Sequence, residues 1–165
     1  MENVSPLSQS EGECQNLPLG KGTYVLVLPA RIRGSLPVGK LGEMQLLPGD
    51  YLYVGSAHGP GGLRSRLRRH LREDKKTFWH IDYLRAYLEI REIWLNTGSR
   101  QLEHRAAEAL SELEGSSIPI PGFGASDCRC PSHLYYFPAQ PELADFLDIF
   151  RTMGKGDINW CVYQV

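Results

Sequence analysis

The chain has 165 residues, with 18 lysines and arginines against 19 aspartates and glutamates, and 42% of its residues are hydrophobic. These values are ordinary for a folded globular domain, and they exclude a disordered, collagen-like or coiled-coil chain. The length predicts one domain whose core is large enough to need no disulfides.

No stretch approaches the roughly 18 apolar residues of a membrane helix, and the acidic N-terminus lacks the basic start of a signal peptide. We therefore expect a cytoplasmic protein without a membrane partner. The cysteines lack the density of a secreted disulfide scaffold and suit a reducing compartment; they are Cys14, Cys128, Cys130 and Cys161.

The first half of the chain predicts a leader followed by strands. Residues 1–20 show no periodicity, and we expect a flexible leader before a single domain over residues 21–165. Apolar, β-branched and aromatic residues predict buried strands over 23–28 and 51–56, which pair most simply as antiparallel neighbours. The connection between them has room for a further short strand at 40–47.

The second half alternates helices and strands. Helices are predicted over residues 63–72, 77–87, 99–114 and 141–151, and strands over 88–96, 132–137 and 161–165. Residues 115–131 are rich in Gly, Pro and Ser and form a loop long enough to suggest a function.

Basic residues are concentrated between positions 64 and 76, where the local charge is +5 while the rest of the chain carries −6. A basic segment in an otherwise acidic chain indicates a local site for a polyanion. An ordinary solvated helix face is the alternative. The candidates for contact with a nucleic-acid backbone are Arg64, Arg68, Arg69, Arg72, Lys75 and Lys76.

Two residues of the first helix lie in an unusual position. At about 100° per residue, the leucines of this helix form one apolar stripe, and Arg66 and His70 lie beside it, one turn apart. A charged side chain there is half buried, which favours a functional role over a solvated one.

The same geometry distinguishes the glutamates of the later helix. Glu103 lies at the margin of the apolar stripe, whereas Glu108 and Glu112 face solvent. Glu103 is therefore the carboxylate best placed to face a cleft, with an ordinary surface glutamate as the alternative.

Short motifs occur in a characteristic order along these elements. Gly22-Thr23-Tyr24, Tyr53-Val54-Gly55, helical Arg66 and His70, and then helical Glu103 resemble the GIY-YIG nuclease superfamily. A wider set of segments is similar to one prokaryotic branch of it, found alone or fused to endonuclease III-type glycosylases: residues 53–57, 59–63, 69–70, 79–84 and 126–134. The resemblance covers about residues 22–137.

The resemblance implies a small α+β fold with a three-stranded antiparallel sheet flanked by helices. To this core the chain adds an inserted strand or loop and a C-terminal helix and strand. It also implies a metal-dependent DNA endonuclease, structure- or damage-directed, with a functional link to a DNA glycosylase. RNA is an alternative substrate, and a non-catalytic nucleic-acid binding module that keeps the fold is an alternative function.

Roles for individual residues follow from the same resemblance. Tyr24 and Tyr53 project into the site, and Arg66 contacts the scissile phosphate. His70 takes a position often held by Tyr or His, and Glu103 binds one Mg²⁺ or Mn²⁺. Chemistry supports these roles, because phosphodiester hydrolysis needs charge neutralisation at the phosphoryl oxygens and an activated water. Tyr24 is favoured over His70 as the base.

The chain departs from the superfamily pattern at three places. Thr23 and Val54 replace the isoleucines of the name motif and preserve β-branching. The connection from Tyr24 to Tyr53 is longer than usual. No asparagine lies between Glu103 and Gly156 to fill a late position seen in other members, and this departure bears on how efficiently the chain cuts.

A second group of candidate metal ligands lies in the loop. Cys128, Cys130 and His133 offer two thiolates and one imidazole within six residues, and Cys14 or Cys161 completes a set of four. These donors suit Zn²⁺, although the spacing is not that of a standard zinc finger. A tight loop with small buried thiols is the alternative.

Overall fold

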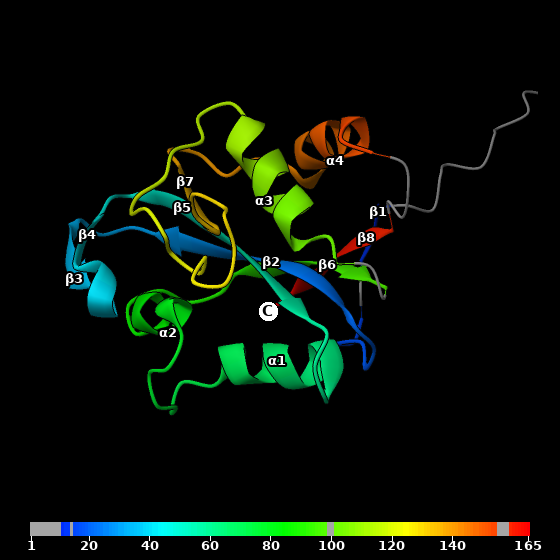
Figure 1. Ribbon diagram of the computed structural model, residues 1–165, viewed down its shortest axis with the longest axis horizontal. Coiled ribbons are helices and arrows are strands. Elements are labelled where there is room, and N and C mark those ends of the chain that lie inside the picture. Colours follow the sequence, from blue (N-terminus) through cyan, green and yellow to red (C-terminus); the bar gives the residue numbers. More distant parts are fainter. Residues whose placement is uncertain (1–10, 14, 99–100, 155–158) are drawn as a thin grey trace, which may run out of the picture.

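In the computed structural model, which describes residues 11–13, 15–98, 101–154 and 159–165, a six-stranded sheet separates two layers of helices (Figure 1). The strands lie in the order β1-β8-β6-β2-β5-β7, and all neighbours are antiparallel except β1 and β8. Their bounds are β1 Glu11–Glu13, β2 Gly22–Ala30, β5 Gly49–Ala57, β6 Glu92–Thr97, β7 Leu134–Phe137 and β8 Trp160–Gln164. The predicted α+β class is confirmed.

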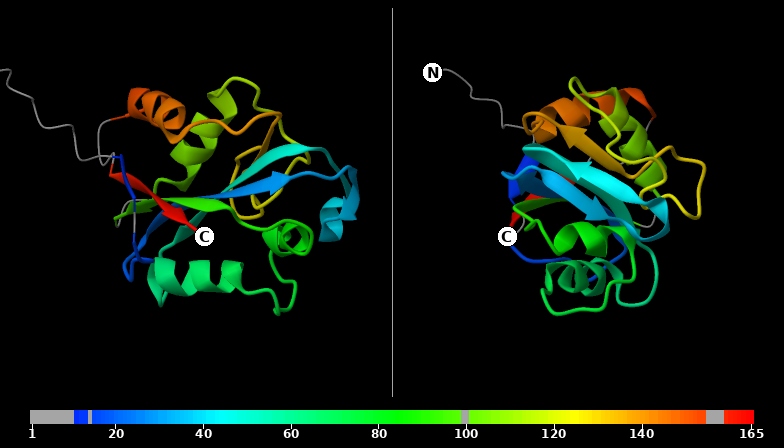
Figure 2. Two further views of the ribbon diagram at one scale, coloured as in Figure 1. Left: turned by 180° about the vertical axis from the view of Figure 1, so that it is seen from behind. Right: turned by 90° about the vertical axis from the view of Figure 1, so that its left-hand side faces the viewer.

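Helices cover both faces of the sheet, as the end-on view in Figure 2 shows. One layer holds α1, Gly62–Leu71, and α2, His80–Arg85. The opposite layer holds α3, Glu103–Glu112, and α4, Leu143–Thr152. Within the described residues, no helix is both long and apolar enough to cross a membrane.

The central strands are buried on both faces, which explains their continuous apolar sequence. Successive side chains of a strand point to opposite faces. On β2, Tyr24 and Leu26 pack in the core under α1 and α2, while Val25 and Val27 pack in the core under α3 and α4. The predicted antiparallel pairing of the first two long strands is confirmed, with Tyr24 opposite Gly55.

The sheet is wider than the three strands expected. Those three correspond to β6, β2 and β5 in its centre, and β7 and β8 extend it on either side. The expected inserted strand is also present, as a hairpin of β3, Gly34–Pro37, and β4, Glu43–Leu46. A 3₁₀ turn, Gly39–Leu41, connects its two strands.

The expectation of a flexible leader over residues 1–20 is wrong for part of that segment. Glu11–Glu13 form β1, which pairs parallel with β8. Leu17 is buried, and its carbonyl accepts a hydrogen bond from Arg64 Nε at 2.8 Å. A three-residue strand that pairs through its backbone at a sheet edge is too short to show a periodic pattern, so it could not be predicted from the sequence. Residues 1–10 and Cys14 lie outside the described residues.

Two predicted helices are shorter in the structure. The helix expected over 77–87 contains only His80–Arg85, because the Asp82 carboxylate accepts hydrogen bonds from the backbone N–H groups of Phe78 and Trp79 and so fixes the start of α2. The helix expected over 99–114 begins at Glu103, and residues 99–100 lie outside the described part of the chain.

Candidate functional site

Two tyrosines and one histidine meet between β2, β5 and α1. The Tyr24 hydroxyl lies 2.7 Å from His70 Nε2. The ring of Tyr53 lies on the same side of the sheet, with its centroid 6.4 Å from that of His70. Tyr24 and His70 are each 1% exposed and Tyr53 is 9% exposed. The structure thus brings together three residues that lie far apart in the sequence.

Gly55 makes room for this arrangement. It faces Tyr24 across the β2–β5 ladder, and a Cβ atom at this position would overlap the Tyr24 hydroxyl. The glycine of the second motif therefore has a steric role, because its missing side chain lets Tyr24 lie across the strand toward His70.

Burial keeps these three side chains uncharged. It lowers the pKa of His70 to about 3, with further lowering by the nearby cations Lys75 and Arg66. Burial also raises the pKa of Tyr24 well above its ordinary value and raises that of Tyr53, with Glu103 adding to the shift at Tyr53. At neutral pH the cluster therefore consists of a neutral imidazole and two protonated phenols.

Arg66 extends from α1 over the neighbouring aromatic ring of Trp79. Its guanidinium carbon lies 4.3 Å from the centroid of the Trp79 ring, and that of Arg69 lies 3.9 Å from the same ring. These three side chains line a pocket of about 230 Å³, together with Ser65 and the glycine-rich turn before α1. Arg66 is half-buried, as its position on the helix predicted.

Asp82, on α2, holds the Arg69 side chain in place beside Trp79. Its two carboxylate oxygens accept hydrogen bonds from Arg69 at 3.0 and 2.8 Å, and Lys75 Nζ lies 3.6 Å away. Burial opposes ionisation of Asp82, but hydrogen bonds from Arg69 and from the backbone of Trp79 and Phe78 lower its pKa to about 2. The carboxylate is therefore charged and fixes Arg69 against Trp79.

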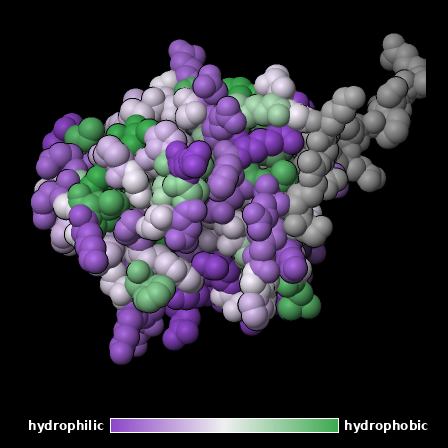
Figure 3. All heavy atoms as spheres, in the orientation of Figure 1, coloured by the Kyte–Doolittle hydropathy of each residue, from purple (hydrophilic) through white to green (hydrophobic). Residues whose placement is uncertain are grey.

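The six basic candidates divide into two groups by these contacts. Arg69 and Lys75 are engaged inside the protein, since Lys75 also donates to the backbone carbonyls of Arg69 and His70. Arg68, Arg72 and Lys76 are exposed, and Arg64 is half-buried against Leu17. Figure 3 shows hydrophilic residues along the lower border of the molecule, where α1 and the loop after it lie.

Glu103 begins α3 and reaches the edge of β5. Its contact on β5 is Ser56, three residues after Tyr53, where the register of β5 with β7 ends. Its Oε2 accepts a hydrogen bond from Ser56 at 2.8 Å, and its Oε1 lies 3.2 Å from His133 Nδ1. The Glu103 side chain is 25% exposed, whereas Glu108 and Glu112 are exposed, as their helix positions predicted.

The charge of Glu103 shifts the pKa of both site tyrosines. Burial opposes its ionisation, but the adjacent His133 imidazole and the hydrogen bond from Ser56 lower the pKa of its carboxyl. Its negative charge raises the pKa of both Tyr24 and Tyr53, while the positive charge of Arg66 lowers them. Glu103 and Arg66 therefore act electrostatically on both tyrosines, and Arg66 also acts on His70.

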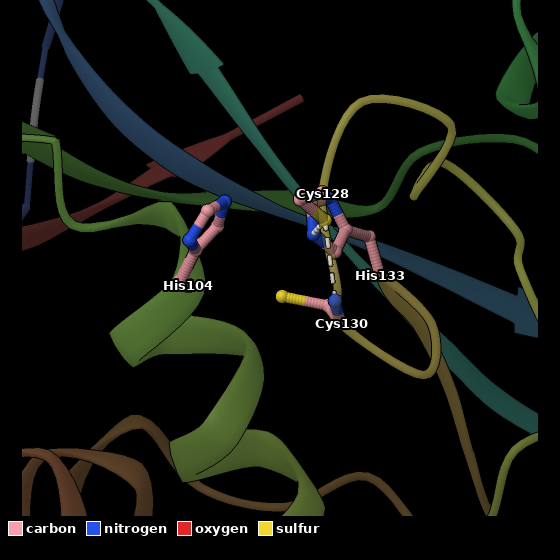
Figure 4. A group of neighbouring side chains, drawn as sticks. All are labelled: His104, Cys128, Cys130 and His133. Carbon is pink, nitrogen blue, oxygen red and sulfur yellow. Dashed lines mark hydrogen bonds between the residues drawn. The ribbon is translucent and has the colours of Figure 1, made fainter.

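A second cluster adjoins Glu103. His104, Cys128, Cys130 and His133 each present a ligand atom, and these atoms all lie within 4.8 Å of one another. Figure 4 shows His104 on α3 facing the three residues of the loop. The cluster has the composition of a metal site, and its predicted loop members do come together.

The fourth member of the cluster differs from the sequence expectation. It is His104, while Cys161 lies in β8 on the other side of the central strands and Cys14 lies outside the described residues. His104 was missed because it lies 24 residues before Cys128, on a helix. Its only signal in the sequence is its position next to Glu103.

Comparison with known proteins gives one family. Residues 23–155 match the model of a family described as a domain of unknown function, DUF123. This match spans most of the chain, so the chain belongs to that family. No curated protein and no solved structure matches the chain.

Proposed function

We propose that this member of the DUF123 family is a divalent-metal-dependent endonuclease of the GIY-YIG type that hydrolyses phosphodiester bonds in DNA. The observation that carries the proposal is the cluster of Tyr24, Tyr53, His70 and Arg66, together with the Glu103 carboxylate, whose charge raises the pKa of both tyrosines. These residues supply hydroxyl groups, a cation and a metal ligand, which are groups that phosphodiester hydrolysis requires.

The pocket beside Arg66 suits a phosphate group. It combines the Arg66 guanidinium with the N-terminal turn of α1, where Gly62 and Ser65 line the wall. A helix N-terminus favours an anion, and a guanidinium donates two parallel hydrogen bonds to phosphoryl oxygens. We assign Arg66 to the scissile phosphate, since its stacking on Trp79 holds the guanidinium in place.

Tyr24 and His70 form a buried hydrogen-bonded pair. The Tyr24 hydroxyl donates to the neutral His70 Nε2 when the ring proton is on Nδ1. Because burial lowers the pKa of His70 to about 3, this imidazole is a weak proton acceptor, and we assign it to holding the Tyr24 hydroxyl in place. We assign Tyr24 as the base for the attacking water. Burial raises its pKa, so a divalent cation on Glu103 would have to lower that pKa for the phenol to act in this way.

Glu103 fits a single Mg²⁺ or Mn²⁺. Its carboxylate is ionised and partly exposed, and such ions are commonly held by one or two carboxylates together with waters and substrate phosphate. A bound ion would act as a Lewis acid on the phosphate and lower the pKa of water. Ser56 and His133 orient the carboxylate for this purpose.

The exposed cations extend the site along the substrate. Arg68 and Arg72 line a broader pocket of about 610 Å³ with Arg64 on the outer side of α1. We assign these residues, together with Lys76, to the DNA backbone, where contacts add affinity without sequence preference. Arg69, which Asp82 holds in place, also lines both pockets, and Lys75 supports the site from within.

The proposal is tested with purified full-length protein and a panel of branched, flapped, abasic and single-stranded DNA. We expect at least one structured or damaged substrate to be cut in Mg²⁺ or Mn²⁺, and cleavage to stop when EDTA is added. Tight binding of every substrate without cleavage in either metal would contradict the proposal and favour the non-catalytic binding module. RNA of matched structure identifies the preferred nucleic acid.

A further inference from the structure

The His/Cys cluster is formed by two segments that lie far apart in the sequence. His104 belongs to the first turn of α3, and Cys128, Cys130 and His133 belong to the loop that ends at β7. We propose that these four residues bind one structural Zn²⁺, and that Glu103 is the carboxylate partner of the zinc ligand His133.

The donor set selects the ion. Two thiolates and two imidazoles are the ligands of structural zinc sites, whereas Mg²⁺ and Mn²⁺ prefer oxygen. Cys128 and Cys130 are both free thiols, so neither is consumed by a disulfide. The cluster is therefore chemically distinct from the carboxylate assigned to the nuclease metal.

The spacing of the donor atoms is close to what zinc needs. With bond lengths of about 2.0–2.3 Å, the ligand atoms of a tetrahedral site lie roughly 3.3–3.8 Å apart. Cys128 Sγ and His133 Nε2 are already 3.3 Å apart, and all four donors lie within 4.8 Å. His104 is exposed on its helix, so a rotation of its side chain can close the remaining gap.

The loop holds its donors in place by hydrogen bonds. The backbone N–H of Cys130 donates to Cys128 Sγ at 3.4 Å, which holds this sulfur in position. Ser132 Oγ bonds to both backbone groups of Leu134, and the Tyr135 hydroxyl donates to the Ser132 carbonyl. His133 is therefore presented from a rigid turn. Zinc would fasten this turn to α3.

His133 connects the cluster to Glu103. Its Nε2 faces Cys128 Sγ, while its Nδ1 lies 3.2 Å from Glu103 Oε1. A metal-bound histidine generally donates its other ring N–H to a carboxylate or carbonyl, which fixes the ring and strengthens it as a ligand. The zinc site itself does not depend on the proposed function; only the second role of Glu103, as the nuclease ligand, rests on it.

Cobalt provides the direct test of the site. Full-length protein, stripped of metal by a chelator under reducing conditions, is titrated with Co²⁺ and then with Zn²⁺. We expect the visible and thiolate charge-transfer absorption of tetrahedral cobalt with one ion per chain, and its loss on adding one equivalent of Zn²⁺. Absence of the thiolate band in the unaltered protein would overturn the proposal, and this result requires no variant to fold.

Variants identify the ligands. Cys128→Ser and His104→Ala should each weaken Zn²⁺ binding by at least tenfold in competition with a chelator, by the size of effect expected for altered metal sites. His58→Ala removes a histidine that is not part of the cluster and should leave binding unchanged. Unaltered affinity in both ligand variants would remove these residues from the site.

The role of Glu103 is tested by zinc affinity without any DNA. Glu103→Ala should weaken Zn²⁺ binding by about 10–100-fold, the usual effect of losing an outer partner. Glu103→Gln keeps an acceptor oxygen for His133 and should recover part of that loss, while Glu108→Ala on the same helix should have no effect. Equal affinity in all three variants would overturn the link, whether or not the protein cuts DNA.

Discussion

The hydroxyl of Tyr24 on β2 and Nε2 of His70 on α1 lie 2.7 Å apart in the interior of the protein, although 46 residues separate them in the sequence. Each group is the polar partner of the other in a region lined by Tyr53 and Trp79. A buried polar group without a partner is costly, so this pair contributes to stability as well as to the proposed chemistry.

Tyr24→Phe therefore affects two properties. The change keeps the ring but leaves His70 Nε2 without its partner, which should lower the free energy of unfolding by about 1–3 kcal/mol. Single-turnover cleavage should fall by roughly a hundredfold or more, with little loss of DNA affinity. Urea unfolding and rapid-quench assays measure the two effects.

Tyr53→Phe serves as the comparison. No side-chain hydrogen bond of the Tyr53 hydroxyl is seen among the described residues, so we expect a smaller change in unfolding free energy. Full cleavage activity in both tyrosine variants would remove these hydroxyl groups from the reaction.

His70 gives stability a specific dependence on pH. Its pKa in the folded protein, about 3, lies below the ordinary 6.5 of the unfolded chain, so between these values the unfolded chain binds a proton that the folded chain does not. Stability should therefore fall as the pH drops below about 6.5, by up to about 1.4 kcal/mol per pH unit.

Replacing the histidine isolates this contribution. His70→Gln cannot titrate, so its unfolding free energy should change less between pH 6.5 and pH 5 than that of the unaltered protein. Between pH 7 and pH 8 the two proteins should show the same dependence, because His70 is then neutral in both states. Parallel curves over the whole range would argue against a neutral buried His70.

Asp82 is expected to be a structural residue of the site. Asp82→Asn leaves Arg69 and Lys75 without their shared carboxylate, so we expect a loss of about 2–4 kcal/mol in unfolding free energy. Asp74→Asn, at an exposed position of the preceding loop, is the control and should change stability little. Equal stability of the two variants would contradict the supporting role of Asp82.

Arg66 and the exposed arginines should affect different steps. Arg66→Ala should suppress single-turnover cleavage far more than binding, because the guanidinium acts on the reacting phosphate. Arg68→Ala and Arg72→Ala should weaken binding to all sequences and lower the log–log salt slope by about one unit for each lost phosphate contact.

The salt experiment separates a binding surface from an ordinary solvated one. If Arg68 and Arg72 merely face water, neither substitution should change the salt slope. If the Arg66 variant binds poorly but cuts normally at saturating DNA, its assignment to the scissile phosphate is wrong.

Local patterns in the sequence were sufficient to predict the central elements. The apolar runs of β2 and β5 and the leucine stripe of α1 are properties of single segments, and they placed His70 inside and Glu108 outside. The order and spacing of the motifs then identified the candidate site residues, which are Tyr24, Tyr53, Arg66, His70 and Glu103.

Contacts between distant segments could not be predicted in this way. His104 joins the cysteine loop only because α3 begins beside it, and β1 exists only because β8 offers an edge. Arg69 resembles its neighbours Arg68 and Arg72 in the sequence, and only the position of Asp82 on α2 distinguishes it. In each case the deciding partner lies on another element.

The most direct test of the nuclease proposal compares Glu103→Gln with Glu108→Gln in zinc-supplemented buffer. Both glutamates lie on α3. The Glu103 carboxylate faces the site, whereas the Glu108 carboxylate faces solvent. Single-turnover cleavage of the best substrate is measured across a range of Mg²⁺ concentrations. We predict that Glu103→Gln loses metal-dependent cleavage while it still folds and binds DNA, and that Glu108→Gln cuts normally. Equal activity of the two variants, or cleavage that persists in both with EDTA present, would contradict the proposal.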